Sequence, residues 1–234
     1  MSFPTLTLFC RYAKILNMLG IIVALPKEAE NLLNNSKIIS EKIIAGKKFY
    51  QCKIKDKIVI IAISNVGKVA SSMTAQILID KFSPDKILNF GSVGGIKEKV
   101  SALEICLVEK CCQYDFDLSA IDNCEVGYNQ NYSSTFLTLS DLPINLKKVS
   151  LATSDKFTHT EEQINIINKL GCDIYDMEGS AIAQVCNSNN IPLFMIKGVT
   201  DVYGSGLQGE QFLANLTTVG KLISEKVLEF IKKI

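Results

Sequence analysis

Strand-like and helix-like segments alternate along most of this sequence, and that alternation restricts the chain to few folds. Short apolar runs bounded by Gly, Pro, Asn or Asp indicate strands, whereas apolar residues three or four positions apart indicate helices. We therefore expect an α/β fold, a single domain with a twisted, mixed β-sheet flanked by helices. The pattern predicts helices at 26–35, 67–82, 160–170, 179–187 and 210–233, and strands at 19–25, 37–63 (three pieces), 85–90, 103–112, 148–153, 172–175 and 192–199.

The length and the first residues bear on domain organisation. A chain of 234 residues is long for one domain and short for two, so one domain is the default. The apolar run at 6–9 is too short for a signal peptide, and Arg11 lies on its wrong side. No stretch approaches the ~18–20 apolar residues of a transmembrane helix. We expect residues 1–17 to be a loosely ordered N-terminal extension, residues 18–234 to form the domain, and the protein to be cytoplasmic.

The charge balance argues against two classes of partner. The chain carries 25 basic and 24 acidic side chains, so it lacks the basic excess typical of proteins that bind nucleic acid or a membrane surface. We expect neither partner. Arg11 is the only arginine, so an arginine cluster for a phosphate co-substrate cannot form. Lysines and backbone amides can still bind phosphate.

Cysteine and histidine usage narrows the chemistry further. The eight cysteines form no C-x-x-C pair, and several stand in apolar runs, as Cys106 and Cys186 do. Buried, reduced thiols are therefore favoured over disulfides or a zinc site. His159 is the only histidine, which argues against His-based metal sites and a Ser-His-Asp triad. We expect His159 to be solvated or to cap a helix.

Three acidic residues stand where a predicted strand gives way to a loop or helix: Glu28, Glu178 and Asp201. Ligands of open α/β sheets bind outside the carboxyl ends of the strands, so the three acids are expected to meet in one pocket. Glycosidic bond cleavage needs such acids, because an oxocarbenium-like transition state requires negative charge, a base for water and an acid for the leaving group. Glu28 and Glu178 are also explained by the preference of helix N-termini for acids, and Asp176 is an alternative to Glu178.

Two glycine-containing segments resemble phosphate-binding loops only superficially. The segment 91–95 (Gly-Ser-Val-Gly-Gly) follows a strand but is not G-x-G-x-x-G, so it is either a tight turn or a place where backbone amides approach a ligand. The segment 65–69 lacks the first glycine and the Ser/Thr of a P-loop. We expect two apolar sets to be core: the pair Ile105 and Leu107, and the stripe Val69, Met73 and Ile77.

Several blocks, in order and spacing, resemble the purine nucleoside phosphorylase/nucleosidase superfamily, and most of all its methylthioadenosine/S-adenosylhomocysteine nucleosidases. The resemblance extends from about residue 19 to the C-terminus, and the ordered set is more specific than any one block. The blocks are 20–30 (GIIVALPKEAE), 64–70 (SNVGKVA), 89–95 (NFGSVGG), 154–157 (SDKF), 176–181 (DMEGSA) and 200–202 (TDV).

The resemblance implies a role for each matching residue. Glu28 is expected to activate the attacking water, and Asp201, steadied by Thr200, to protonate adenine N7. Glu178 would hold ribose hydroxyls and help fix the water. The remaining substrate-binding positions are Met177 against the ribose, Ser92 near the ribose and nucleophile, Phe157 stacked on adenine, the backbone of Thr158 at the edge of the base, and Ala24 and Gly94. The resemblance implies neither a metal nor an organic cofactor, a small purine nucleoside as substrate, and a homodimer whose second subunit closes part of the pocket.

The chain also departs from the family pattern, mainly around the 5′-substituent. Lys197 and Asp176 stand where Arg and Glu are common, so any pairing between them is remodelled. The segment 203–211 lacks the aromatic residue expected over the substrate, and 114–117 lacks a histidine. Rival interpretations are a futalosine hydrolase, another purine nucleosidase, a nucleoside phosphorylase, and a non-catalytic nucleoside-binding module.

Overall fold

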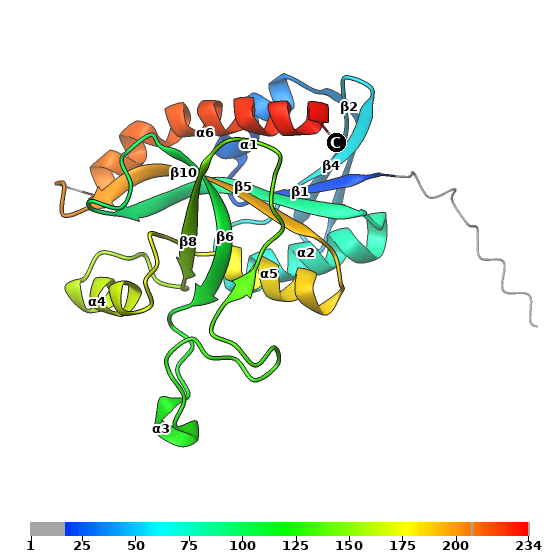
Figure 1. Cartoon of the computed structure of the whole chain (residues 1–234). Coiled ribbons are helices and arrows are strands. Elements are labelled where there is room, and N and C mark those ends of the chain that lie inside the picture. The colour runs from blue at the N-terminus through cyan, green and yellow to red at the C-terminus, as the bar shows by residue number, and fades with distance from the viewer. Residues whose placement is uncertain (1–16, 207, 234) are drawn as a thin grey trace, which may run out of the picture.

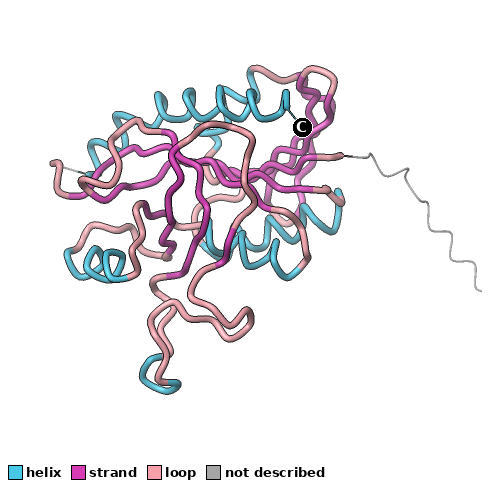
Figure 2. The backbone as a smooth tube through the Cα atoms, in the orientation of Figure 1, coloured by secondary structure: helices cyan, strands magenta, loops and turns pink. Residues whose placement is uncertain are grey.

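A mixed β-sheet forms the centre of the molecule (Figure 2), and the expected α/β class with a single domain is confirmed. The computed structural model describes residues 17–206 and 208–233, so the expected extension at 1–17 lies, except for Asn17, outside the described residues. The strands are β1 (Leu19–Val23), β2 (Lys37–Ile44), β3 (Lys47–Ile54), β4 (Lys57–Ile63), β5 (Lys86–Ile96), β6 (Ile105–Gln113), β7 (Leu137–Thr138), β8 (Lys147–Thr153), β9 (Ile174–Asp176) and β10 (Leu193–Tyr203).

The long strand β5 organises this sheet. It pairs in parallel with β1 and β10 and, near its end, antiparallel with β9. The strands follow the order β10-β6-β8-β9-β5-β1-β4-β3-β2, with β7 beside β6. Because β10 also pairs with β5, the five strands β10, β6, β8, β9 and β5 close into a ring. The carboxyl ends of β1, β5 and β10 therefore lie close together.

Helices cover both faces of the sheet (Figure 1). The helices α1 (Pro26–Asn34) and α6 (Gln208–Lys233) pack together on one face, and α2 (Lys68–Phe82) and α5 (Gly179–Ser188) on the other. Since neighbouring residues of a strand point to opposite faces, Ile22 joins the core with Leu78 of α2, while Ile21 joins the core with Val219 of α6. Helices α3 (Ser119–Asp122) and α4 (Glu161–Lys169) complete the chain.

Two strands run further than the sequence predicts. The glycine-rich segment 91–95 is part of β5, so the expectation of a tight turn is wrong. These glycines serve close packing: a Cβ at Gly94 would lie 2.0 Å from the ring of Tyr175, and one at Gly95 would lie 2.4 Å from Val100. Strand β10 continues to Tyr203, with a register shift between Val199 and Asp201. Asp201 therefore lies within a strand rather than just after it.

The core expectations are confirmed in part. Leu107 is buried and Ile105 partly buried. Of the stripe on α2, Ile77 is partly buried against the core, but Val69 and Met73 are not core, because they are 81% and 39% exposed. Helical spacing identifies an apolar face without saying what covers it. Of the seven cysteines in the described ranges, all are free and all but Cys124 are buried, as expected. Within the same ranges, no helix is long and apolar enough to cross a membrane.

Candidate active site

A cavity of about 340 Å³ opens where β1, β5, β9 and β10 end. The three predicted acids all reach it, together with all but one of the predicted substrate-binding residues. The exception, Thr200, is fully buried behind the wall and contacts Asp201. The cavity is lined by Ala24, Leu25, Glu28, Val66, Ser92, Val93, Gly94, Lys156, Phe157, Thr158, Tyr175, Asp176, Met177, Glu178, Asp201 and Phe212.

Glu28 is held at one end of the cavity by three donors from two elements. It stands in the first turn of α1, where Pro26 begins the helix, and its Oε2 accepts a hydrogen bond from the amide of Leu25 at 2.9 Å. Its Oε1 accepts hydrogen bonds from Ser92 N at 2.7 Å and from Ser92 Oγ at 2.5 Å. A Cβ at Gly91 would lie 3.3 Å from the same oxygen, so this part of β5 leaves room for the carboxylate. Glu28 therefore caps its helix and also faces the cavity.

Glu178 and Asp176 lie side by side but are held differently. Asp176 accepts hydrogen bonds from Thr153 Oγ1 at 2.6 Å and Gly179 N at 2.9 Å, and forms an ion pair with Lys197 at 2.8 Å. The side chains of this ion pair are only 1–2% exposed, so the departures at 176 and 197 keep a direct, buried pairing. Asp176 is thus fully engaged in structure.

Glu178 has fewer partners, since its Oε1 accepts one hydrogen bond, from Gly67 N at 2.9 Å. Burial and the neighbouring charge of Asp176 raise the pKa of Glu178 to about 7, against the opposing effect of Lys197. Of the two acids, Glu178 is the one whose carboxyl group remains available to a ligand.

Asp201 occupies the other end of the cavity and is 1% exposed. Its Oδ1 accepts a hydrogen bond from Thr200 Oγ1 at 2.8 Å, and its Oδ2 accepts one from Gln208 Nε2 at 3.2 Å. Burial raises the pKa of Asp201, while hydrogen bonds from Thr200, Gln208 and Tyr175 act in the opposite direction. Burial therefore shifts this carboxyl towards the protonated form that a general acid needs.

The wall beside Asp201 is aromatic. Phe157 lines the cavity with its ring 45% exposed, and Thr158 is anchored by a 2.7 Å hydrogen bond between its Oγ1 and Tyr114 OH. Burial raises the pKa of Tyr175 well above its usual value, so its hydroxyl stays neutral. His159 does not line the cavity. It is exposed, and its amide donates to Gln163 Oε1 at the start of α4, in agreement with the expected solvated or capping role.

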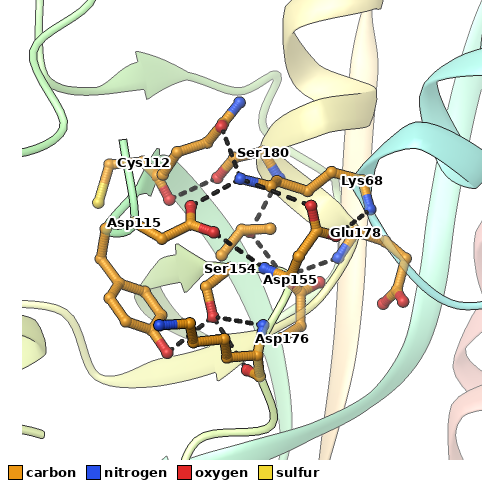
Figure 3. A network of polar contacts seen from close by, with 12 residues as sticks. Lys68, Cys112, Asp115, Ser154, Asp155, Asp176, Glu178 and Ser180 are labelled. Carbon is orange, nitrogen blue, oxygen red and sulfur yellow. Dashed lines mark hydrogen bonds and ion pairs between the residues drawn. The ribbon is translucent and has the colours of Figure 1, made fainter. Parts of the chain in front are cut away.

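A polar network ties together the loops around the cavity (Figure 3). Lys68 Nζ lies 2.7 Å from Asp115 Oδ1, and Lys68 N donates to Asp155 Oδ1 at 2.8 Å. Asp155 N in turn donates to Asp115 Oδ2 at 3.0 Å. Since Asp155 is two residues from Phe157, the network fixes the loop that carries the aromatic ring. The ammonium group of Lys68 is thereby paired with carboxylates.

Three residues near the cavity were missed by sequence reasoning: Tyr175, Gln208 and Phe212. Tyr175 immediately precedes the Asp176–Glu178 motif, so the motif was a signal that could have found it. Gln208 has no motif that marks it. Phe212 supplies an aromatic side chain to the cavity one residue beyond the segment 203–211. The expected shortage of an aromatic residue is therefore wrong, because the segment was cut one residue too early.

The described residues hold no group of three or more His, Cys, Asp or Glu side chains placed to bind a metal ion. The side chains that line the cavity carry carboxyl groups, hydroxyls and the amine of Lys156.

Comparisons with known proteins identify the family of the chain. Residues 18–232 match the family described as the phosphorylase superfamily. A 5′-methylthioadenosine/S-adenosylhomocysteine nucleosidase of Oceanobacillus iheyensis is 30% identical over 230 residues, which cover 92% of this chain and 99% of the relative. The structure of futalosine hydrolase from Helicobacter pylori shares the fold, with a TM-score of 0.86 at 23% identity over 93% of this chain and 98% of that one.

A second solved structure was obtained with adenine bound. It is a Borrelia burgdorferi protein described as a candidate 5′-methylthioadenosine/S-adenosylhomocysteine nucleosidase. It matches with a TM-score of 0.85 at 27% identity, covering 93% of this chain and 100% of that one.

Proposed function

Since the chain belongs to the phosphorylase superfamily, we propose that it hydrolyses the N-glycosidic bond of 5′-methylthioadenosine, S-adenosylhomocysteine or both, releasing adenine. Its sequence relatives place it among the nucleosidases of that superfamily. The observation that carries the proposal is the single cavity that holds Glu28 and Glu178 at one end and Asp201, with its raised pKa, at the other.

The reaction divides between the two ends of the cavity. Glu28 takes a proton from water as the water oxygen bonds to C1′ of the ribose. Asp201 gives a proton to N7 of the base as the bond from C1′ to N9 breaks, so adenine leaves as a neutral molecule. Adenine anion is a poor leaving group, and positioned proton transfer of this kind typically contributes 10²–10⁴-fold. Free sugar and free adenine are the products.

The other residues orient the nucleoside between these two groups. Glu178 accepts hydrogen bonds from ribose hydroxyls, while Ser92 and Met177 face the sugar. Phe157 stacks on the base, and the backbone of Thr158 hydrogen-bonds the edge of the base. Ala24 and Gly94 form the floor, and Thr200 holds the orientation of Asp201. All of these residues except Thr200 line the cavity.

Water rather than phosphate is the proposed nucleophile. The only arginine is Arg11, and Lys68 is already paired with Asp115 and Asp155. A phosphorylase would need a cluster of positive charge to bind and orient phosphate, and among the described residues Lys156 is the one basic side chain that lines the cavity.

A homodimer is part of the proposal. The face of α2 next to the cavity loops exposes Val69 at 81% and Met73 at 39%, and Val66, 47% exposed, lines the cavity itself. A second subunit on this face would bury apolar surface and close the side of the cavity. We also propose that the enzyme is cytoplasmic, in keeping with its buried free cysteines.

The deciding experiment is chromatographic detection of free adenine from methylthioadenosine, S-adenosylhomocysteine and adenosine, each with and without phosphate. Adenine and free sugar from the thio-nucleosides, at a rate indifferent to phosphate, are the expected result. Sugar 1-phosphate would make the protein a phosphorylase. Cleavage of futalosine alone would assign it to the futalosine hydrolases, and ligand-induced thermal stabilisation without any released base would make it a binding module.

A further inference from the structure

The side-chain amide of Gln208 contacts three residues that line the cavity, in the region where the proposed function places the edge of the purine. Its Nε2 lies 2.7 Å from Tyr175 OH, 3.2 Å from Asp201 Oδ2 and 3.3 Å from Thr158 O. Two of these oxygens belong to the residues to which the proposed function assigns the base: Asp201 at N7 and Thr158 at the edge.

The group placed there has the chemistry of part of the substrate. A carboxamide nitrogen is planar and carries two N–H donors in fixed directions. The exocyclic amine of a 6-aminopurine is also planar with two N–H donors, and it lies next to N7. Such an amine would donate one hydrogen bond to the general acid at N7 and one to a carbonyl at the edge of the purine. Gln208 Nε2 contacts one acceptor of each kind here, Asp201 Oδ2 and Thr158 O.

We propose that Gln208 is an internal stand-in for the exocyclic amine of the base: its amide occupies the amine position in the free enzyme and is displaced when a 6-aminopurine nucleoside binds. This inference rests on the proposed function for the identity of the base. It goes further by assigning a residue that sets the affinity for the base and its selectivity.

The surroundings of Gln208 suit a group that leaves and returns. Tyr175 cannot yield, because its ring is packed against the backbone of Gly94. Gln208, in contrast, is the first residue of α6 and only partly buried, so rotation about its own side-chain torsions takes the amide out. The nearby Gly204 and Gly206 have positive φ angles of 82° and 133°, which leaves the preceding segment free of Cβ constraints there.

Displacement of a stand-in selects among bases. A 6-aminopurine replaces two of the three contacts that Gln208 gives up, those to Thr158 O and Asp201 Oδ2, so the exchange is largely balanced for these two buried oxygens. A 6-oxopurine presents a carbonyl oxygen to the acceptors Thr158 O and Asp201 Oδ2, and the buried oxygens are then left without donors. We therefore expect adenine to displace Gln208 and hypoxanthine to fail.

The contact with Gln208 also affects the acid. In the free enzyme the hydrogen bond from Gln208 favours the charged form of Asp201, so a variant without this donor has a higher pKa at Asp201, whereas in the complex the amine of the base supplies the hydrogen bond in its place. The titratable group that contacts Asp201 is Tyr175, which stays neutral, and the remaining titratable side chains of the cavity are Glu28, Lys156, Asp176 and Glu178.

The test is the variant Gln208→Met, which keeps the length of the side chain and removes both donors. Its matched control is Gln211→Met on the same helix, because the amide of Gln211 is used on Ser205 and Val202 rather than on the cavity. The dissociation constant of free adenine is measured by titration calorimetry for both variants and the wild type. We expect Gln208→Met to bind adenine about 5- to 30-fold more tightly, since adenine no longer has to break the hydrogen bonds of the Gln208 amide to Thr158, Tyr175 and Asp201.

A second measurement separates a displaced group from a structural one. The pH profile of kcat/KM reports ionisations of the free enzyme. The alkaline side of this profile, where Asp201 loses its proton, should move to higher pH in Gln208→Met. The pH profile of kcat reports ionisations of the enzyme–substrate complex, from which the Gln208 amide has already been displaced. The alkaline side of that profile should therefore not move. A purely structural loosening would shift both or neither.

Three results would overturn the inference. These are an adenine affinity that is unchanged or weaker in Gln208→Met, an equal gain in Gln211→Met, and no binding of adenine to any of the three proteins. The proposed function is judged separately by hydrolysis. If the wild type releases adenine but Gln208→Met gains no affinity for adenine, only the displacement of Gln208 is contradicted. An affinity gain without hydrolysis breaks only the proposed function.

Discussion

The two ends of the cavity hold their carboxyl groups in different ways. At the hydrolytic end (Glu28, Ser92 and Glu178), donors come largely from backbone amides: Leu25 and Ser92 for Glu28, and Gly67 for Glu178. At the base end (Thr158, Tyr175 and Asp201), the acid is contacted by side chains, Thr200 and Gln208. The carboxylates of the hydrolytic end are thus held mainly by backbone donors, and the carboxyl group of the base end by side-chain donors.

The difference follows the chemistry proposed for each end. A group that takes a proton from water must be a carboxylate before the reaction, and fixed backbone donors keep its oxygens in place as acceptors. A group that delivers a proton must carry that proton when the base is bound. Burial raises the pKa of Asp201 towards this protonated form, whereas fixed backbone donors like those that contact Glu28 favour an ionised carboxylate. The comparison therefore predicts that substitutions at the base end change protonation, and that substitutions at the hydrolytic end change position and stability.

The largest expected effect comes from Asp201→Asn at the base end. Asparagine keeps the size of the side chain and can still contact Thr200, but it has no acidic proton to give to N7. We expect kcat to fall by about 10²–10⁴-fold, while the dissociation constant of a methylthioadenosine analogue stays within a few-fold of the wild-type value. Single-turnover rates and calorimetry measure the two quantities. A variant that keeps a third of the wild-type rate would remove Asp201 from the acid's role.

The next effect concerns the foundation of the hydrolytic end, the buried ion pair of Lys197 and Asp176. Lys197→Met leaves the carboxylate of Asp176 buried without its counter-charge, which typically costs about 3–5 kcal/mol of folding free energy. For a chain of this size that lowers the melting temperature by roughly 6–20 °C. Calorimetry measures the shift.

Two further variants test whether the loss of stability comes from the unpaired charge of Asp176. Adding Asp176→Asn to Lys197→Met removes the unpaired charge and should recover part of the loss. Lys226→Met removes an exposed pair with Glu229 and should cost no more than about 1 kcal/mol. If Lys197→Met were no more destabilising than Lys226→Met, the ion pair would not support the hydrolytic end.

The same contrast explains what the sequence could and could not predict. Glu28, Glu178 and Asp201 were found because an acid at the end of an apolar strand stands out, and the parallel strands bring such positions together. The strand-like segment 91–95 was missed because glycines signal turns, although here they make room for Tyr175 and Val100. The exposed Val69 was misassigned because periodicity does not reveal what covers a helix face.

Gln208 shows most clearly which residues sequence patterns cannot predict. Its amide contributes through contacts with Thr158, Tyr175 and Asp201, which are brought together only by the closed ring of strands and the start of α6. No local sequence pattern predicts contacts between residues so far apart in the chain. Groups held by the backbone at the ends of strands can be inferred from a sequence pattern, whereas a side chain whose contacts come from three separate segments of the chain cannot.

A smaller effect is expected in the pH dependence of stability. The pKa of Glu178 rises from an ordinary value of 4.5 to about 7 in the folded protein, so the folded state holds this proton more tightly than the unfolded state. The resulting stabilisation is fully present below pH 4.5 and is lost as the pH rises through 7, at most about 3 kcal/mol. Urea unfolding between pH 4.5 and 8 should therefore show wild-type stability falling relative to Glu178→Gln. Parallel curves would contradict the assignment.

The smallest effect is expected for Ser92→Ala at the hydrolytic end. The substitution removes the hydroxyl donor to Glu28 Oε1 but keeps the amide of residue 92 at 2.7 Å and that of Leu25 at 2.9 Å. If backbone donors are enough to hold the general base Glu28, kcat/KM should fall by about tenfold, the low end of what one hydrogen bond to a charged group contributes. The affinity for free adenine should not change, because the base binds at the other end. A loss as large as that of Asp201→Asn would mean that the hydrolytic end also depends on a rotatable side chain, and the distinction between the two ends would fail.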